Sequence, residues 1–222
     1  MGWFKDALAF LMKGGPVMVP LIGCSIISVA VIIERFIKLR QAAADTSDLI
    51  ETVEDHIYRG RYEIAAEICR KSGTPVGEVL AAGIAQARRG VSAVQHAMEE
   101  QGIREQSKLH VRLGALDTII TIAPLLGLLG TVTGMIRSFH VISTKQGLST
   151  PTAVTGGVAE ALIATATGLA IAIATLIAYN YFNERVKHII EQIELRATQI
   201  VNVFSDILEE EGGHHEVKSL SA

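Results

Sequence analysis

Charge is missing from three long stretches of this 222-residue sequence. There are 20 uncharged residues after Lys13, 19 after Asp117 and 23 after Glu160. A helix needs about 20 apolar residues to cross a bilayer core, which excludes charged side chains. Buried helices of a large soluble protein are the alternative, but the rest of the chain is mostly charged and amphipathic and could not cover all three stretches. We therefore predict an all-α membrane protein with spans at 14–33, 117–139 and 156–183.

Several other classes of protein are excluded because the residues or motifs that define them are scarce or absent. The two cysteines, Cys24 and Cys69, lie far apart without a CxxC motif, which excludes a zinc ribbon, a disulfide scaffold and a thioredoxin-like site. A net charge of −3 argues against nucleic-acid binding through phosphate neutralisation. There is no Walker loop, GxGxxG, HExxH or plausible catalytic triad. We expect no enzyme, cofactor or metal site, and we interpret the tail histidines His214 and His215 as solvated.

The distribution of lysine and arginine predicts the orientation, because basic residues remain on the cytoplasmic side. Three follow the first span and three precede the second, so 34–116 is predicted to be a cytoplasmic helical domain. The N-terminus and the 140–155 connection then lie outside, and the C-terminus inside. Pro16 and Pro20 make a cleaved signal peptide a weaker interpretation of the first span. The basic residues that decide the orientation are Arg35, Lys38, Arg40, Arg104, Lys108 and Arg112.

The polar parts of the chain show helical periodicity. Breaks at Gly60, 72–75 and Gly90 predict several helices rather than strands. From Val91 onward we expect one long helix that enters the second span. Apolar residues after the third span alternate at spacings of 4 and 3 over 184–208, which predicts a helix with a bundle seam whose partner is either the 91–115 helix or neighbouring copies. The seam consists of Val186, Ile190, Ile193, Ala197, Ile200, Phe204 and Ile207.

The two ends of the chain differ from its middle. Residues 1–13 are short and rich in aromatics, and we expect them to lie along the outer membrane interface; an ordinary frayed terminus is the alternative. Residues 209–222 are charged and contain glycine, which predicts a disordered tail.

Glycine and threonine dominate the second span. Gly130 and Gly134 form a small-xxx-small pair that lets helix backbones approach closely. Packing alone would explain the glycines but explains Thr131 and Thr133 less well, although a threonine can bond to its own helix backbone. The residues that we assign to helix packing are Pro124, Gly127, Gly130, Gly134 and Gly168.

The third span carries an acid on a face of small and hydroxylated residues. A carboxylate at the centre of a span costs roughly 2.5–3.5 kcal/mol, so Glu160 is predicted to have a functional role. The alternative is that Glu160 lies in the headgroup region, where the cost is small. At about 100° per residue, Thr165 falls outside this face. The face contains Glu160, Ala164, Thr167, Gly168, Thr175 and Ala178, with the bulkier Ile171. The opposite face, suited to lipid or a neighbouring helix, contains Leu162, Leu169, Ile173, Leu176 and Ile177.

Two segments closely resemble the MotA/TolQ/ExbB proton-channel family. They are APLLGLLGTVTGMI at 123–136, followed by Phe139, and GVAEALIATATGL at 157–169. GPVMVPL at 15–21 and Glu34-Arg35 are similar to the family's first span and its end. The resemblance extends to about residue 205. Three spans with a large segment after the first are similar to ExbB and TolQ rather than to the four-span MotA.

The resemblance implies a function and partners. It implies a bacterial inner-membrane motor subunit that forms a homopentameric ring, with the second and third spans extended into a cytoplasmic bundle. Inside the ring would lie a dimer of a single-span ExbD/TolR-type partner with a membrane aspartate, and a TonB/TolA-type protein is a further candidate partner. Protons would flow inward and power outer-membrane transport or envelope maintenance.

The resemblance also implies an ion pathway. By position, Thr131, Glu160 and Thr165 match the family's pathway residues. Thr133 and Thr167 add hydroxyls and are weaker candidates. Asp117 is also a weaker candidate: it opens the second span without a matching family role, and is either a proton exit on the cytoplasmic side or an interfacial cap. The extra hydroxyls leave sodium as an alternative to protons, since hydroxyl oxygens suit hard cations. The stator of a gliding or other surface-motility motor is an alternative function in the same class. A non-conducting membrane scaffold is the alternative from another class.

Overall fold

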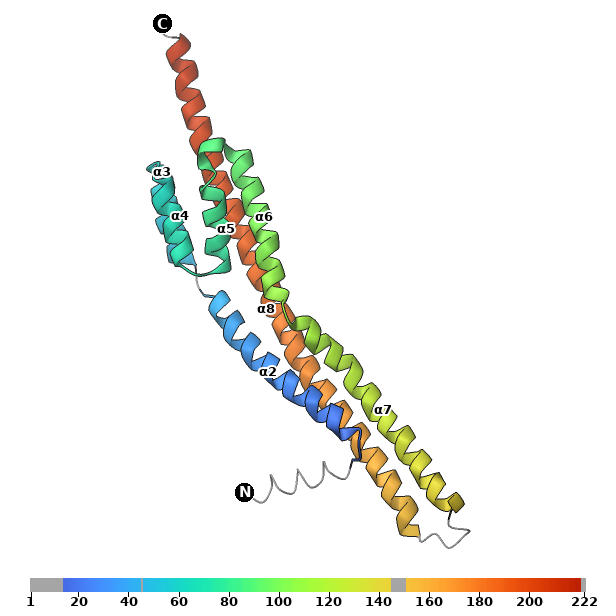
Figure 1. The fold of residues 1–222 in the computed structure, drawn as a ribbon. Helices are drawn as coiled ribbons and strands as arrows, with labels where there is room; N and C mark the ends of the chain where they lie inside the picture. The colour runs from blue at the N-terminus through green and yellow to red at the C-terminus, as the bar shows by residue number, and fades with distance from the viewer. Residues whose placement is uncertain (1–13, 45, 145–150, 221–222) are drawn as a thin grey trace, which may run out of the picture. The chain divides into compact units, whose positions relative to one another are not determined.

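The fold is helical throughout the part of the chain that the structure describes. The structure is a computed structural model, and it describes residues 14–44, 46–144 and 151–220, with side chains at 14–44, 46–140 and 155–207. The chain divides into two compact units, Met1–Arg35 with Arg112–Tyr181 and Phe36–Val111 with Phe182–Ala222 (Figure 1). The predicted interfacial segment at 1–13 lies outside the described residues.

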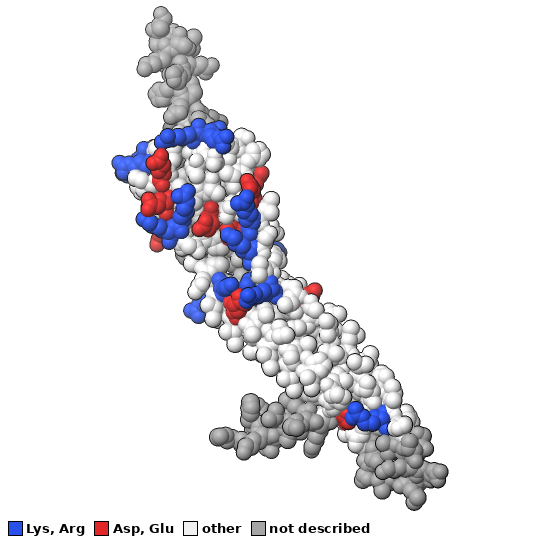
Figure 2. Space-filling view, in the orientation of Figure 1, with Lys and Arg blue, Asp and Glu red and all other residues white. Residues whose placement is uncertain are grey.

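The first unit is built from three long apolar helices. Helix α2 is Met18–Ala42, α7 is Leu113–Thr144 and α8 is Pro151–Leu220. Each is long and apolar enough to cross a membrane, which agrees with the three predicted spans. The face of this unit drawn in Figure 2 is largely free of charge. The residues predicted to face lipid or a neighbouring helix are exposed, namely Leu162, Leu169, Ile173, Leu176 and Ile177.

Small residues let α7 and α8 pack closely in the first unit. A Cβ atom added at Gly130 would lie 2.5 Å from the Ala164 Cβ, and one added at Gly168 would lie 2.5 Å from the Ala123 carbonyl oxygen. Real Cβ atoms do not approach other atoms so closely, so larger residues would push the two helices apart. Close backbone approach is how helices gain packing energy in lipid, where the hydrophobic effect between them is weak.

The second unit contains four shorter helices and the later part of α8. Helix α3 is Ser47–Tyr58, α4 is Tyr62–Lys71, α5 is Pro75–Ile84 and α6 is Val91–His110, with a 3₁₀ turn, η1, at Ala87–Arg89. The predicted breaks are confirmed, because Gly60, Gly73 and Gly90 adopt positive φ angles of 68°, 63° and 93° between these elements. At α5, the Thr74 hydroxyl accepts a hydrogen bond from the Gly77 N–H at 3.1 Å and caps the helix start.

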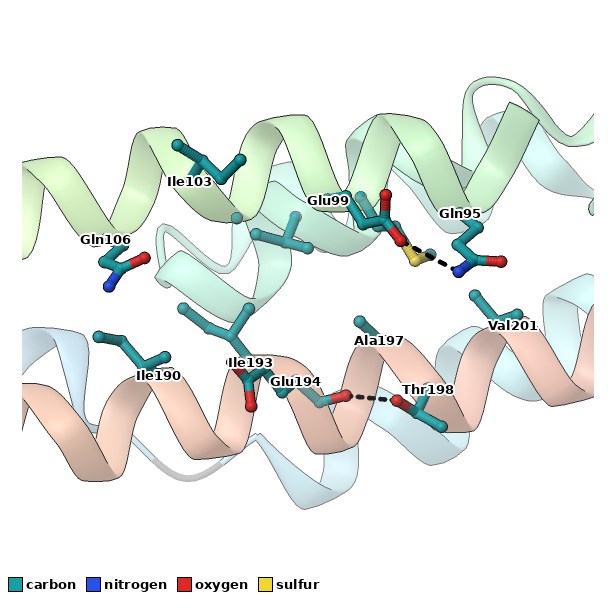
Figure 3. Close-up of a pocket in the computed structure, with 13 residues that line it drawn as sticks. Gln95, Glu99, Ile103, Gln106, Ile190, Ile193, Glu194, Ala197, Thr198 and Val201 are labelled. Atoms are coloured by element: carbon teal, nitrogen blue, oxygen red, sulfur yellow. Dashed lines mark hydrogen bonds between the residues drawn. The ribbon is translucent and has the colours of Figure 1, made fainter. Parts of the chain in front are cut away.

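Helices α6 and α8 face each other across a groove in the second unit. Figure 3 shows Ile103 and Gln106 of α6 opposite Ile190, Ile193 and Ala197 of α8. The cavity between them measures about 510 Å³. The predicted seam of α8 is therefore directed in part at the chain's own α6. Its buried members are Val186, Ile193, Ile200 and Phe204.

Three boundaries differ from the sequence predictions. The predicted long helix from Val91 into the second span is wrong: α6 ends at His110, Val111 is extended, and Arg112 has a left-handed φ of 65° before α7 begins. Helix α7 reaches Thr144 and α8 begins at Pro151, so both helices extend into the predicted 140–155 connection; proline suits a first helical turn. Helix α8 ends at Leu220, whereas we predicted a disordered tail from 209; side chains there are not described, and the tail stays a prediction.

Candidate functional site

The acid of the third span is paired with a base of the second. Arg137 Nη1, on α7, donates hydrogen bonds to Oε1 and Oε2 of Glu160 on α8 at 2.7 and 3.0 Å. The Glu160 side chain is 20% exposed and the Arg137 side chain 51%. A third element contacts the same carboxylate: Gly15 has a φ of 74°, and a Cβ added there would overlap Glu160 Oε1. The residues before α2 thus approach Glu160 so closely that only glycine fits.

The threonine hydroxyls of the site all donate to backbone carbonyl oxygens. Thr131 donates to Leu128 at 2.6 Å, Thr133 to Leu129 at 2.9 Å, and Thr167 to Ile163 at 2.8 Å, each within its own helix. Thr165 differs, because its hydroxyl crosses from α8 to the Gly127 carbonyl of α7 at 2.9 Å. A hydroxyl that donates in this way keeps its lone pairs for accepting other hydrogen bonds.

Glu160 and Thr165 lie on different sides of α8. Five residues at about 100° each separate them by roughly 140° around the helix. Their contacts agree with this separation, since Glu160 contacts Arg137 and the residues before α2, whereas Thr165 contacts the Gly127 backbone. Among the described residues, no hydrogen bond joins Glu160 to any of the four threonines. The structure therefore does not gather the predicted pathway residues into one cluster within a single protomer.

The small, hydroxylated face of the third span proves to be mostly a packing face. Thr175 is 1% exposed, and its hydroxyl lies 2.8 Å from the Ser28 hydroxyl of α2. Ala164 is fully buried beside Gly130, and Gly168 packs on the Ala123 carbonyl. Glu160, Thr167 and Ala178 of this face are half-buried. A helical projection cannot distinguish a face that packs on neighbouring helices from one that lines a channel.

The remaining predicted residues lie along α7. Asp117 is exposed near the start of the helix, and its backbone carbonyl accepts a hydrogen bond from Thr121 at 3.2 Å. The Asp117 carboxylate makes no ion pair among the described residues. Pro124 lies within the helix and is half-buried. Gly127 and Gly134 both face α8, at Thr165 and Ala161 respectively.

Sequence reasoning missed the partners of the acid and of the buried threonine. Arg137 lies inside α7 and pairs with Glu160, a role that we did not predict for it. Its distance of 23 residues from Glu160 gives no periodic signal, and only the antiparallel arrangement of α7 and α8 brings the two together. Ser28 was a detectable signal, because it is a polar residue within an apolar span. The structure shows no group of three or more metal-ligating side chains among the residues it describes.

Comparison with known proteins places these helices in a family. The family model described as the MotA/TolQ/ExbB proton channel family matches residues 71–195. A Synechocystis protein named as ExbB-like, for biopolymer transport, is 35% identical over 173 residues, which are 77% of this chain and 82% of that protein. An ExbB homologue of Methanothermobacter thermautotrophicus is 31% identical over 88% of this chain and 69% of its own length.

A relative named for a second system is also similar. The Tol-Pal system protein TolQ of Pseudomonas aeruginosa is 36% identical over 148 residues, which cover 67% of this chain and 58% of that protein. The region that the family model matches includes the Glu160–Arg137 pair, the four threonines and the glycines between α7 and α8, but not Gly15. With three apolar helices and a matching model over more than half of its length, the chain belongs to the MotA/TolQ/ExbB proton channel family.

Proposed function

We propose that the chain is the proton-channel subunit of an energy-transducing motor in the inner membrane. Five copies form a ring around a dimer of a single-span ExbD/TolR-type protein, whose membrane aspartate carries the proton. The N-terminus faces the periplasm, and the C-terminus lies in the cytoplasm with the 34–116 helices and the extensions of the second and third spans. The motor powers outer-membrane transport or envelope maintenance, through a TonB/TolA-type protein.

The observation that carries the proposal is a carboxylate held in place on an otherwise uncharged part of α8. Glu160 is the only acidic residue from 151 to 183, and its carboxylate is 2.7 Å from Arg137. Ionisable residues in membrane spans are costly, and they commonly mark ion pathways. The pairing lowers that cost and fixes the side chain at one end of the third span. An acid fixed there can receive or release an ion without first reorganising.

The threonines support a path for protons carried by water or by the partner's aspartate. Thr131 and Thr165 donate their hydroxyl protons to carbonyl oxygens, so their remaining lone pairs accept from water or from a protonated acid. They bring no fixed charge that would compete with the moving one. Thr133, Thr167 and Asp117 are secondary members of the same pathway. Such acceptors also suit sodium, and a comparison of proton and sodium gradients would separate the two ions.

The contacts also support the scaffold alternative. The Thr165 hydroxyl bonds across to α7, which would fit a residue that only joins two helices. The glycines, however, are already used in packing α7 on α8 within one protomer, and a scaffold would need Glu160 only for its ion pair with Arg137. A stator of a motility motor would use the same pathway. Whether the chain serves such a stator or an outer-membrane system depends on the partner protein rather than on this chain.

Assembly and work must be measured together to test the proposal. Thr165→Val and Glu160→Ala are made in cells that express the partner, with Leu162→Ala as the control, since Leu162 is 63% exposed on the opposite side of α8. Native mass spectrometry gives the number of subunits in each complex. The outer-membrane transport or envelope maintenance that the motor powers, here called work, is measured with and without the proton motive force. We expect both variants to assemble as rings and lose work. Rings with work at the wild-type level would contradict the pathway, and a monomer or dimer as the only species would contradict the ring.

A further inference from the structure

A polar pocket lies in the second unit, away from the predicted ion pathway. It is formed where the chain passes from α2 into α3, against the α8 segment that follows the third span, and its volume is about 260 Å³. The side chains of α8 that line it follow the first of them by three, four, seven and eleven residues, which places them on one helix face. The residues of α8 in the wall are Arg185, His188, Ile189, Gln192 and Arg196.

The charge of this wall is of one sign. Arg185 and Arg196 supply two guanidinium groups, and His188 supplies an imidazole. No carboxylate is among the described lining residues; Asp45, between Ala44 and Thr46 in the sequence, lies outside the described residues. Arg185 makes no hydrogen bond or ion pair in the described part of the chain. Arg196 donates from Nη1 to Gln199 at 3.1 Å, but its Nε is buried without a partner. Like charges repel, and an unpaired buried donor costs free energy, so an anion bound here would stabilise this arrangement.

The opposite wall adds an unpartnered hydroxyl. Thr46 is 7% exposed, and its side chain makes no cap bond at the start of α3 and no other hydrogen bond among the described residues. The N-terminus of this 12-residue helix contributes the positive end of its dipole. Asp48, in its first turn, is exposed and does not line the pocket. His188 pairs with an acid outside the pocket, Glu191, whose carboxylate lies 3.9 Å from the imidazole on the exposed side of α8.

The position along the chain indicates what the anion belongs to. Arg185 follows the end of the third predicted span by two residues, and Ala42 follows the first by nine. At 1.5 Å per residue, Arg185 lies about 3 Å beyond the third charge-free segment, and Ala42 lies about 14 Å beyond the first. Phospholipid headgroups extend about 5–8 Å beyond the hydrocarbon core on each side, so the Arg185 end of the pocket lies at their depth. Basic pockets at this level bind their phosphates.

We propose that Arg185, Arg196, His188 and Thr46 form a binding site for a phosphate group. Guanidinium groups suit phosphate because they donate paired, charge-assisted hydrogen bonds to its oxygens. The phosphate belongs to an anionic phospholipid of the surrounding leaflet or to a free phosphate ion, and the two sources share this chemistry. The site is separate from the proposed ion pathway and does not depend on it.

The test is a titration of the purified full-length protein in a non-ionic detergent and a phosphate-free buffer, followed by calorimetry. The probes are dioctanoyl phosphatidylglycerol, dioctanoyl phosphatidylcholine and inorganic phosphate. We expect saturable binding of at least one anionic probe. Phosphatidylcholine should bind about tenfold more weakly, because the choline ammonium of its zwitterionic headgroup is repelled by the arginines. Tighter binding of phosphatidylglycerol than of phosphate assigns the site to lipid, and the reverse order assigns it to the free ion.

Variants decide whether the pocket is the site. Arg185→Gln with Arg196→Gln should weaken binding about tenfold or more, since two charged donors are lost. Lys187→Gln is the matched control, because it removes one positive charge from the same helix outside the pocket, and it should stay within about twofold. If the double variant is not helical, Thr46→Val replaces it and should weaken binding measurably. No binding of either anionic probe, or equal binding in the wild type and the pocket variants, would overturn the proposal.

Discussion

Arg137 and Glu160 form an ion pair between the second and third spans, in which one guanidinium nitrogen donates to both carboxylate oxygens at 2.7 and 3.0 Å. The pair joins two residues on antiparallel helices and lies against Gly15 before the first span. Three separate parts of the chain thus fix one carboxylate. The acid that the sequence singled out has a defined position even before a partner protein binds.

Reversing the charge of Arg137 should lower the free energy of unfolding, because it breaks this ion pair. Arg137→Glu places two carboxylates together, and we expect it to destabilise the protein by about 1 kcal/mol, because partly exposed charge pairs contribute up to that amount. Adding Glu160→Arg should restore most of the loss. Thermal unfolding in detergent, followed by circular dichroism, measures both variants. An Arg137→Glu protein as stable as the wild type would show that the two side chains are not in contact.

The left-handed residue between α6 and α7 predicts that glycine is more favourable than alanine at this position. Arg112 has a φ of 65° and its guanidinium contacts the Glu34 carboxylate. Alanine and glycine both remove this contact, but only alanine keeps the left-handed strain, so Arg112→Gly should be more stable than Arg112→Ala by about 1 kcal/mol. At Arg104, inside α6, the order should reverse by about the same amount. Denaturant unfolding of the four variants measures both differences, and the same order at both positions would contradict the left-handed conformation.

The contact between α7 and α8 predicts a strong dependence on glycine position. Gly168→Ala places a methyl group 2.5 Å from the Ala123 carbonyl oxygen, and we expect a loss of about 1–3 kcal/mol from overpacking. Gly156→Ala is the matched control on the same helix, because a Cβ there has open space around it. That variant should be neutral or slightly more stable, since alanine favours helix. Equal unfolding temperatures for the two variants would contradict the close packing at Gly168.

The thiol of Cys69 should be unreactive in the folded protein. Cys69 is fully buried, and burial raises its pKa to about 12 from its usual value near 9. The thiolate is the reactive form, so alkylation of a Cys24→Ala protein at pH 8 should be slow until denaturant is added. Because the folded pKa is the higher one, the unfolded chain loses this proton first, and stability should fall as the pH rises from about 9 toward 12. Rapid alkylation of the folded protein would contradict the burial of Cys69.

Much of the fold was predictable because it depends on local signals. The three gaps in charge located the apolar helices, and glycines that need positive φ angles located the breaks at Gly60, Gly73 and Gly90. The break at Arg112 gave no such signal, since a non-glycine residue holds the left-handed conformation and its contact with Glu34 is 78 residues away in sequence. Non-local contacts of this kind are not visible in periodicity.

The candidate site was predictable in its residues more than in its arrangement. The threonines and Glu160 were identified from their cost in an apolar span and from resemblance. Their partners were not, because Arg137 contacts Glu160, and the Gly127 carbonyl contacts Thr165, only once the helices are packed. Thr175 illustrates the reason, since it shares the Glu160 face in projection but is buried against Ser28. Which residues line a channel depends on neighbouring copies and on the partner.

Proton flux tests the central claim most directly. The complete complex with its single-span partner is reconstituted into vesicles, a pH gradient is imposed, and the internal pH is followed with a sensitive dye. Glu160→Gln keeps the size of the side chain and removes its charge, with Leu162→Met on the exposed opposite side of α8 as the control. We expect Glu160→Gln complexes of normal composition to lose flux, while the control conducts like the wild type. Flux at the wild-type level in assembled Glu160→Gln complexes would contradict the account.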